Sequence, residues 1–115
     1  MDMNKETENK IAKLQLIEQN MQQFLMQKQN FNAQLMEVKN ALREIEETKG
    51  KSYKIVGNIM VASDKDKLKE DLENKTDILN IRIRNIKKQE QNLKEQAENI
   101  QKEVMNELNL NKDEE

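Results

Sequence analysis

The fold is decided by a short stretch near the middle of the chain, Lys51–Ala62, which reads KSYKIVGNIMVA. Two apolar segments rich in β-branched residues, Tyr53–Val56 and Ile59–Ala62, lie on either side of Gly57 and Asn58. Glycine at the first of two central positions is typical of a type II′ turn between antiparallel strands. The sequence therefore predicts a β-hairpin made of these two segments.

Both faces of this hairpin are expected to be apolar. In the register of a two-residue turn, Ile55 and Met60 lie on one face and Val56 and Ile59 on the other, and Lys54 is the only polar side chain. A lone two-stranded hairpin is marginally stable in water. A hairpin folded down on its own helices is the alternative, but two helix ends offer little area to cover it. We therefore expect an oligomerisation element. Its expected contact residues are Tyr53, Ile55, Val56, Gly57, Ile59, Met60 and Val61.

The sequence before the hairpin has the heptad spacing of a coiled coil. From Leu14 to Ile45, the positions that would line the seam between two helices alternate in steps of three and four, and only Lys28 breaks their apolar character. We expect a helix over residues 5–49. Gly50 would end it, because glycine accepts the positive φ that often closes a helix.

A second heptad run follows the hairpin over Leu72–Val104. It predicts a helix over residues 64–110, followed by a frayed tail over 111–115. Its N-cap is either Ser63, as part of a capping box, or Asp64.

The two runs match each other when the chain folds back at the hairpin. Seam positions then face each other where their numbers sum to 114, as Leu14 and Ile100 do. The sequence predicts a mainly α fold, a long antiparallel two-helix coiled coil with one β-hairpin at the bend, as a single domain over residues 1–115. In this register Lys28 and Glu90 lie in neighbouring layers. They either pair across the seam or extend to solvent independently.

Composition excludes several classes of function. The chain has 115 residues, 37% charged and 3% aromatic, with no Cys and no His. Common metal and thiol chemistries therefore have no ligands, and we expect no cofactor, no metal and no enzyme activity. The net charge of −2 argues against a nucleic-acid partner. No apolar run is long enough for a membrane span, and the N-terminal MDMNKETENK lacks the apolar core of a signal peptide, so a cytoplasmic chain is expected.

The hairpin at the middle of a heptad seam resembles the prefoldin family. The most specific stretch is Tyr53–Val61, YKIVGNIMV, which is similar to the hairpin of the archaeal β subunits. The resemblance implies a hexamer of two α and four β subunits, whose hairpins form a β-barrel body carrying six coiled coils. It further implies an ATP-independent chaperone that captures unfolded polypeptides, its clients, at the coiled-coil tips and delivers them to a group II chaperonin. A structural or adaptor coiled coil without chaperone activity is the alternative.

A client-holding tip needs apolar surface that the seam does not use. Apolar residues near both ends of the chain supply it if the end layers of the seam loosen around the small residue Ala97. Leu16 is alternatively a scattered surface residue. The expected client-binding residues are Ile11, Leu14, Leu16, Ile17, Val104 and Leu108.

Overall fold

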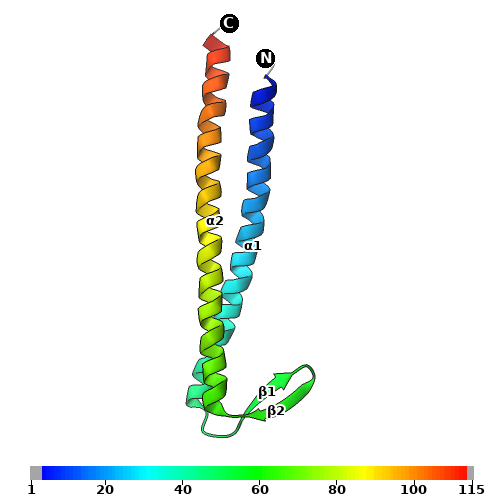
Figure 1. Ribbon diagram of the computed structural model, residues 1–115, viewed down its shortest axis with the longest axis vertical. Coiled ribbons are helices and arrows are strands. Elements are labelled where there is room, and N and C mark those ends of the chain that lie inside the picture. Colours follow the sequence, from blue (N-terminus) through cyan, green and yellow to red (C-terminus); the bar gives the residue numbers. More distant parts are fainter. Residues whose placement is uncertain (1–3, 114–115) are drawn as a thin grey trace. The chain divides into compact units, whose positions relative to one another are not determined.

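The computed structural model describes residues 4–113, with side chains over residues 4–109. Its elements, in chain order, are α1 (Lys5–Glu47), β1 (Ser52–Val56), β2 (Ile59–Ser63) and α2 (Lys65–Asp113) (Figure 1). The predicted mainly α fold is confirmed, since two long helices are separated by one antiparallel hairpin. No helix within the described residues is long and apolar enough to cross a membrane.

The start of α1 is fixed by its cap. The Asn4 side-chain oxygen accepts a hydrogen bond from the backbone N–H of Thr7, at 2.7 Å, which satisfies one of the amides that a first turn leaves without an intrahelical partner. Glu6 and Glu8 lie in the same turn, where negative charge interacts favourably with the helix dipole.

The end of α1 differs from the prediction. The helix ends at Glu47, two residues early, and Gly50 does not have a positive φ. The Thr48 side chain donates to the Glu44 carbonyl at 2.6 Å, and the Lys65 ammonium donates to the Thr48 carbonyl at 2.8 Å. Side chains thus bond to one carbonyl of the last turn and to the carbonyl of the residue that follows it, and the helix ends without a glycine in the left-handed conformation.

The hairpin has the predicted register, with Val56 opposite Ile59, and one further pair, Ser52 with Ser63. Gly57 has a φ of +62°, whereas no described residue other than glycine has a positive φ. A type I′ turn would need positive φ at Asn58 as well, so the turn is of the predicted II′ kind.

At the start of α2, the structure decides between the two expected caps. The Asp64 side chain accepts a hydrogen bond from the backbone N–H of Asp66 at 3.2 Å, so Asp64 is the N-cap. The helix continues to Asp113, three residues beyond the expected end at 110, because no glycine or proline follows to stop it. The remainder of the expected frayed tail, residues 114–115, lies outside the described residues.

The chain forms two compact parts. Among the described residues, the terminal part comprises 4–27 and 86–113, and the hairpin part comprises 28–85. In the terminal part, the first turns of α1 lie beside the last turns of α2 (Figure 1). The centre of this part is a cluster of Ile17, Ile100 and Val104. Partly buried residues packed against this cluster are Ile11, Leu14, Met21, Leu93, Ala97 and Leu108.

The hairpin part is held by a second stretch of the same seam. Its buried apolar residues are Val38, Leu68, Leu79 and Ile83. Beside them, the Arg82 guanidinium carbon lies 5.8 Å from the centre of the Phe31 ring, and Lys69 pairs with Glu46 at 3.5 Å.

These contacts test the predicted register. The register predicts that the numbers of facing residues sum to 114. The numbers of Thr7 and Glu107, which bond in the terminal part, sum to 114, and those of Arg82 and Phe31 sum to 113. Every predicted seam position is buried or half-buried, including Lys28. The heptad pattern therefore identified the buried face of both helices.

Candidate functional site

An open groove of about 450 Å³ runs along the terminal part between α1 and α2. On α1 its lining residues recur at helical spacing, and three residues of α2 complete it. The apolar lining consists of Ile11, Leu14, Ile17, Met21 and Ala97. A concave surface of this kind, mostly apolar with a few polar groups, is the usual form of a binding site.

Four exposed polar side chains complete the lining of the groove. Gln15 and Glu18 contribute from α1, and Lys94 and Gln101 contribute from α2. The lining therefore includes one negative charge, one positive charge and two amides, which can both donate and accept hydrogen bonds. This arrangement is able to contact both the apolar side chains and the backbone of a polypeptide.

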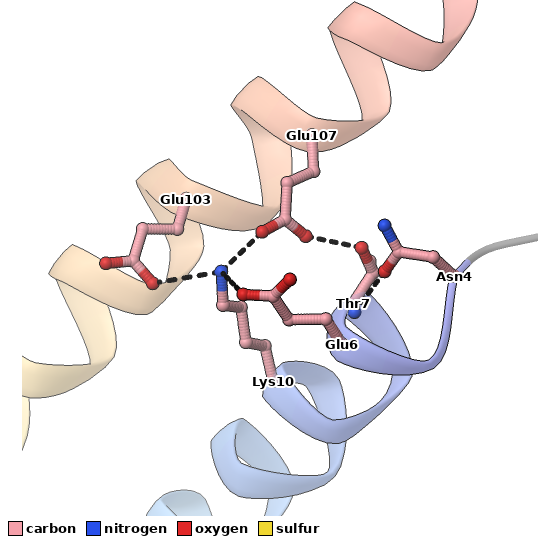
Figure 2. Close-up of polar contacts among 6 residues, drawn as sticks. All are labelled: Asn4, Glu6, Thr7, Lys10, Glu103 and Glu107. Atoms are coloured by element: carbon pink, nitrogen blue, oxygen red, sulfur yellow. Dashed lines mark hydrogen bonds and ion pairs between the residues drawn. The ribbon is translucent and has the colours of Figure 1, made fainter.

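A polar cluster lies at the ends of the two helices (Figure 2). Thr7 is fully buried, and its hydroxyl donates a hydrogen bond to the Glu107 carboxylate. The Lys10 ammonium of α1 contacts the Glu107 carboxylate of α2. It also lies 3.4 Å from the carboxylate of Glu103, which is on α2 as well, and 3.6 Å from that of Glu6 on α1. We call Glu6, Thr7, Lys10, Glu103 and Glu107 the terminal polar cluster.

Electrostatics in the terminal polar cluster favour the charged forms of both main partners. The hydrogen bond from Lys10, followed by the one from Thr7, holds the pKa of the Glu107 carboxyl below its usual value. The hydrogen bond to Glu107 likewise raises the pKa of the Lys10 ammonium, and loss of hydration opposes that rise. The cluster is therefore a charged contact between the two helix ends over a broad range of pH.

Sequence reasoning missed the terminal polar cluster, although a signal for it exists. The steps of three and four that define the seam continue from Leu14 back to Lys10 and Thr7, and from Val104 on to Glu107. The apolar pattern stops there, but the helix geometry does not. Extending the seam past its last apolar layer would have identified Thr7 and Glu107 as facing residues.

The predicted client-binding residues occupy three environments. Ile11, Leu14 and Ile17 line the groove. Val104 and Leu108 belong to the packed cluster and do not line it. Leu16 is 57% exposed and also lies outside the groove lining.

Burial separates the predicted set further. Ile17 and Val104 are buried in this structure, with 5% and 8% of their surfaces exposed. The predicted loosening of the end layers therefore stays a prediction. Met21, which the spacing assigns to the seam, packs against the cluster and also lines the groove.

The hairpin is the second candidate surface. All six of its large apolar residues have between 47% and 69% of their surfaces exposed. Exposed apolar side chains on both faces of one hairpin form an apolar surface of the kind that marks a protein interface. These residues are Tyr53, Ile55, Val56, Ile59, Met60 and Val61.

Within the described residues, no group of three Asp or Glu side chains is placed to hold a metal ion. The two candidate surfaces are the apolar groove of the terminal part and the apolar faces of the hairpin. Both are suited to contact with polypeptide.

Comparison with known proteins identifies the family. The family model described as "Prefoldin subunit" matches residues 8–110. The chain is 35% identical over 105 residues to the prefoldin subunit beta of Sulfurisphaera tokodaii, covering 90% of this chain and 83% of that protein. It is also 35% identical over 82 residues to the prefoldin subunit beta of Thermococcus onnurineus, covering 70% and 71% of the two chains.

A solved structure supports the same assignment. The crystal structure of the prefoldin beta subunit from Thermococcus strain KS-1 matches with a TM-score of 0.86 at 28% identity, covering 91% of this chain and 94% of that one. These relatives are all archaeal β subunits. The chain therefore belongs to the prefoldin family.

Proposed function

We propose that this chain is the β-type subunit of a cytoplasmic, hetero-oligomeric prefoldin that holds unfolded polypeptides without ATP and catalyses no reaction. The observation that carries the proposal is the exposed apolar hairpin in a chain of this family. An isolated hairpin with two apolar faces is marginal in water, so a stable arrangement needs other strands beside it.

The hairpins of several subunits supply those strands. In our proposal they join into one β-barrel body containing two α and four β subunits, because closure into a barrel removes the unpaired edges of each hairpin. The exposed fractions of Ile55, at 69%, and Ile59, at 66%, support this, since these residues lie on opposite faces of the hairpin.

Clients bind at the terminal part in this proposal, in and around the apolar groove. Each contact is weak, and several arms acting on one client raise its effective concentration and therefore the overall avidity. Methionine, present at Met21 in the lining, adapts to differently shaped clients because its side chain is unbranched. The captured client then passes to a group II chaperonin.

Assembly is tested by native mass spectrometry of the chain alone and mixed with an α-type subunit. A hexamer that forms only in the mixture supports the proposal. A stable dimer of the chain alone, unchanged by the α subunit, would instead indicate an adaptor coiled coil.

Chaperone activity is tested separately, by light scattering from a chemically denatured model protein diluted into buffer with the reconstituted complex and no nucleotide. Suppressed scattering is expected at a stoichiometric amount of complex. Scattering equal to that of a buffer control would contradict the holdase role even if the hexamer forms.

A further inference from the structure

We infer that Ala97 determines which client side chain the groove accepts, because the space beside its methyl group admits one bulky, uncharged apolar side chain of an extended segment. This inference rests on the proposed function, because an unfolded client is what would supply such a segment. It adds a specificity-determining residue to that function.

The small side chain of Ala97 leaves volume unfilled in the seam. Its neighbours along the α2 seam are Leu93, Ile100 and Val104, so one layer between large side chains holds only a methyl group. Ala97 packs against the buried cluster and also lines the groove. The space that a larger residue would fill is thus open to an outside molecule.

Unfilled apolar space favours an apolar occupant. The atoms lining such a space lack contact partners on one side, and protein interiors are otherwise close-packed. A leucine or phenylalanine side chain entering beside Ala97 would contact Leu14 and Ile17, which also line the groove. Such a side chain would regain those contacts and leave water at the same time.

The charges in the groove lining balance. Glu18 and Lys94 carry opposite charges, and Gln15 and Gln101 are neutral. An acidic or a basic segment would be attracted by one of the two charges and repelled by the other, so the lining offers a charged segment no net attraction. A charged side chain entering the apolar lining would also lose hydration, which an uncharged side chain does not. The balanced lining therefore matches an uncharged segment.

The length of the lining matches a short extended segment. The lining extends along α1 from Ile11 to Met21, which is about 15 Å at the rise of an α-helix. About four extended residues cover that distance, and their side chains point alternately toward and away from the groove. The two amides of the lining can then bond to the backbone of the segment, which is unpaired in an unfolded chain.

The experiment uses the assembled complex with full-length chains and compares wild type with Ala97→Leu. The probe is a fluorescent peptide of serine, glycine and glutamine with one central leucine, and its Kd is measured by anisotropy. Because the added side chain fills the space from within, we expect unchanged or higher thermal stability and probe binding weakened on the order of tenfold. The matched control is Ala12→Leu, the same change at an exposed position of α1 outside the groove lining.

A peptide series sharpens the test. For wild type, affinity should fall when the central leucine is replaced by alanine, and fall further with glutamate or lysine. Ala97→Leu should remove the difference between the leucine and alanine peptides. If it binds the leucine peptide as tightly as wild type does, or if Ala12→Leu weakens binding equally, the inference is wrong.

Two further measurements keep this inference separate from the proposed function. If the wild-type complex captures no denatured protein at all, the proposed function itself fails. A second case is that the wild-type complex captures client while hydrogen exchange shows that Ala97→Leu destabilises the helix ends. In that case Ala97→Val tests the role of Ala97, because valine fills part of the space with less overpacking. A stable Ala97→Val complex with undiminished affinity for the leucine peptide overturns the role of Ala97.

Discussion

Gly57 occupies the first central position of the hairpin turn with a φ of +62°. A side chain at this position has open space around it, as it does at Gly50, so sterics against neighbouring residues do not distinguish the two glycines. Backbone conformation does, because residues with a Cβ are strained at positive φ.

Gly57→Ala is therefore expected to destabilise the hairpin by about 1–2 kcal/mol. Hydrogen exchange measures this as a loss of protection of the strand amides by about 5- to 30-fold. Gly50→Ala is the matched control and should leave exchange unchanged. Equal effects of both substitutions would contradict the assignment of the turn.

Glu107 determines how the terminal polar cluster responds to pH. Its pKa is lowered in the folded chain, so its contribution is complete above the ordinary value of 4.5 and is lost as pH falls through the lowered value. The pKa of Lys10 is raised above 10.5, so its contribution is complete below 10.5 and is lost at still higher pH.

Glu107→Gln should consequently lower the Tm of the complex near neutral pH and lose that deficit in acid. Thermal melts followed by circular dichroism give the difference in Tm between wild type and variant at each pH. We expect it to be constant from about pH 6 to pH 9, to shrink once the pH falls below 4.5, the ordinary pKa of the carboxyl, and to vanish only below its lowered pKa. Glu98→Gln, outside the terminal polar cluster, should show no comparable trend, and a deficit that persists in acid would refute the ionic role of Glu107.

At the scale of elements, hydrophobic spacing predicted the most. Steps of three and four located both helices and their buried faces, and the residue types around Gly57 defined the strands and their pairing. These features depend on local patterns that repeat many times, so errors at single positions do not matter. Helix ends depend on a few side chains, as Thr48 and Lys65 show at the end of α1, and were predicted less well.

The candidate site was harder to predict than the fold. Apolar type alone could not distinguish Ile11, which lines the groove, from Leu16, which lies outside its lining, because both are off the strict seam. The distinction comes from the face of α1, because Ile11 lies three residues before Leu14 on the side that lines the groove and Leu16 does not share that spacing. The terminal polar cluster was missed for a related reason, since Thr7, Lys10 and Glu107 are polar residues on a seam defined by apolar ones.

The hairpin element has its own test. Ile55→Asp places a charge on a face that the proposed barrel buries, and burial of an unpaired charge is strongly unfavourable. We expect the hexamer to be absent by native mass spectrometry, while the helical circular dichroism signal of the chain remains.

Ile81→Asp is the control for this substitution, because Ile81 is 51% exposed on α2, outside the hairpin. Hexamers of normal mass with Ile55→Asp would show that this face of the hairpin is not an interface. Loss of assembly with Ile81→Asp as well would show that the effect is not specific to the hairpin.

For the whole molecule, assembly and client capture should be separable. Deleting residues 1–17 and 98–115 removes most of the groove lining and the terminal polar cluster, and leaves the hairpin part, residues 28–85, intact. The truncated chain should still form the hexamer with the α subunit and should no longer suppress aggregation of a denatured protein.

Static light scattering of the complex and turbidity of the denatured protein measure these two properties. The full-length complex at equal concentration is the reference. Aggregation suppressed as well as by full-length chains would place client binding outside the terminal part, and would require another surface to be sought.

The open strand edges of the hairpin have a consequence for how the cell must make this protein. A copy produced in excess of its partners carries unpaired β-strands with apolar faces, which are the features that nucleate intermolecular sheet growth. Balanced synthesis of the two subunit types, or rapid degradation of orphaned copies, would keep a protein that we propose to guard others against precipitation from becoming a seed for it.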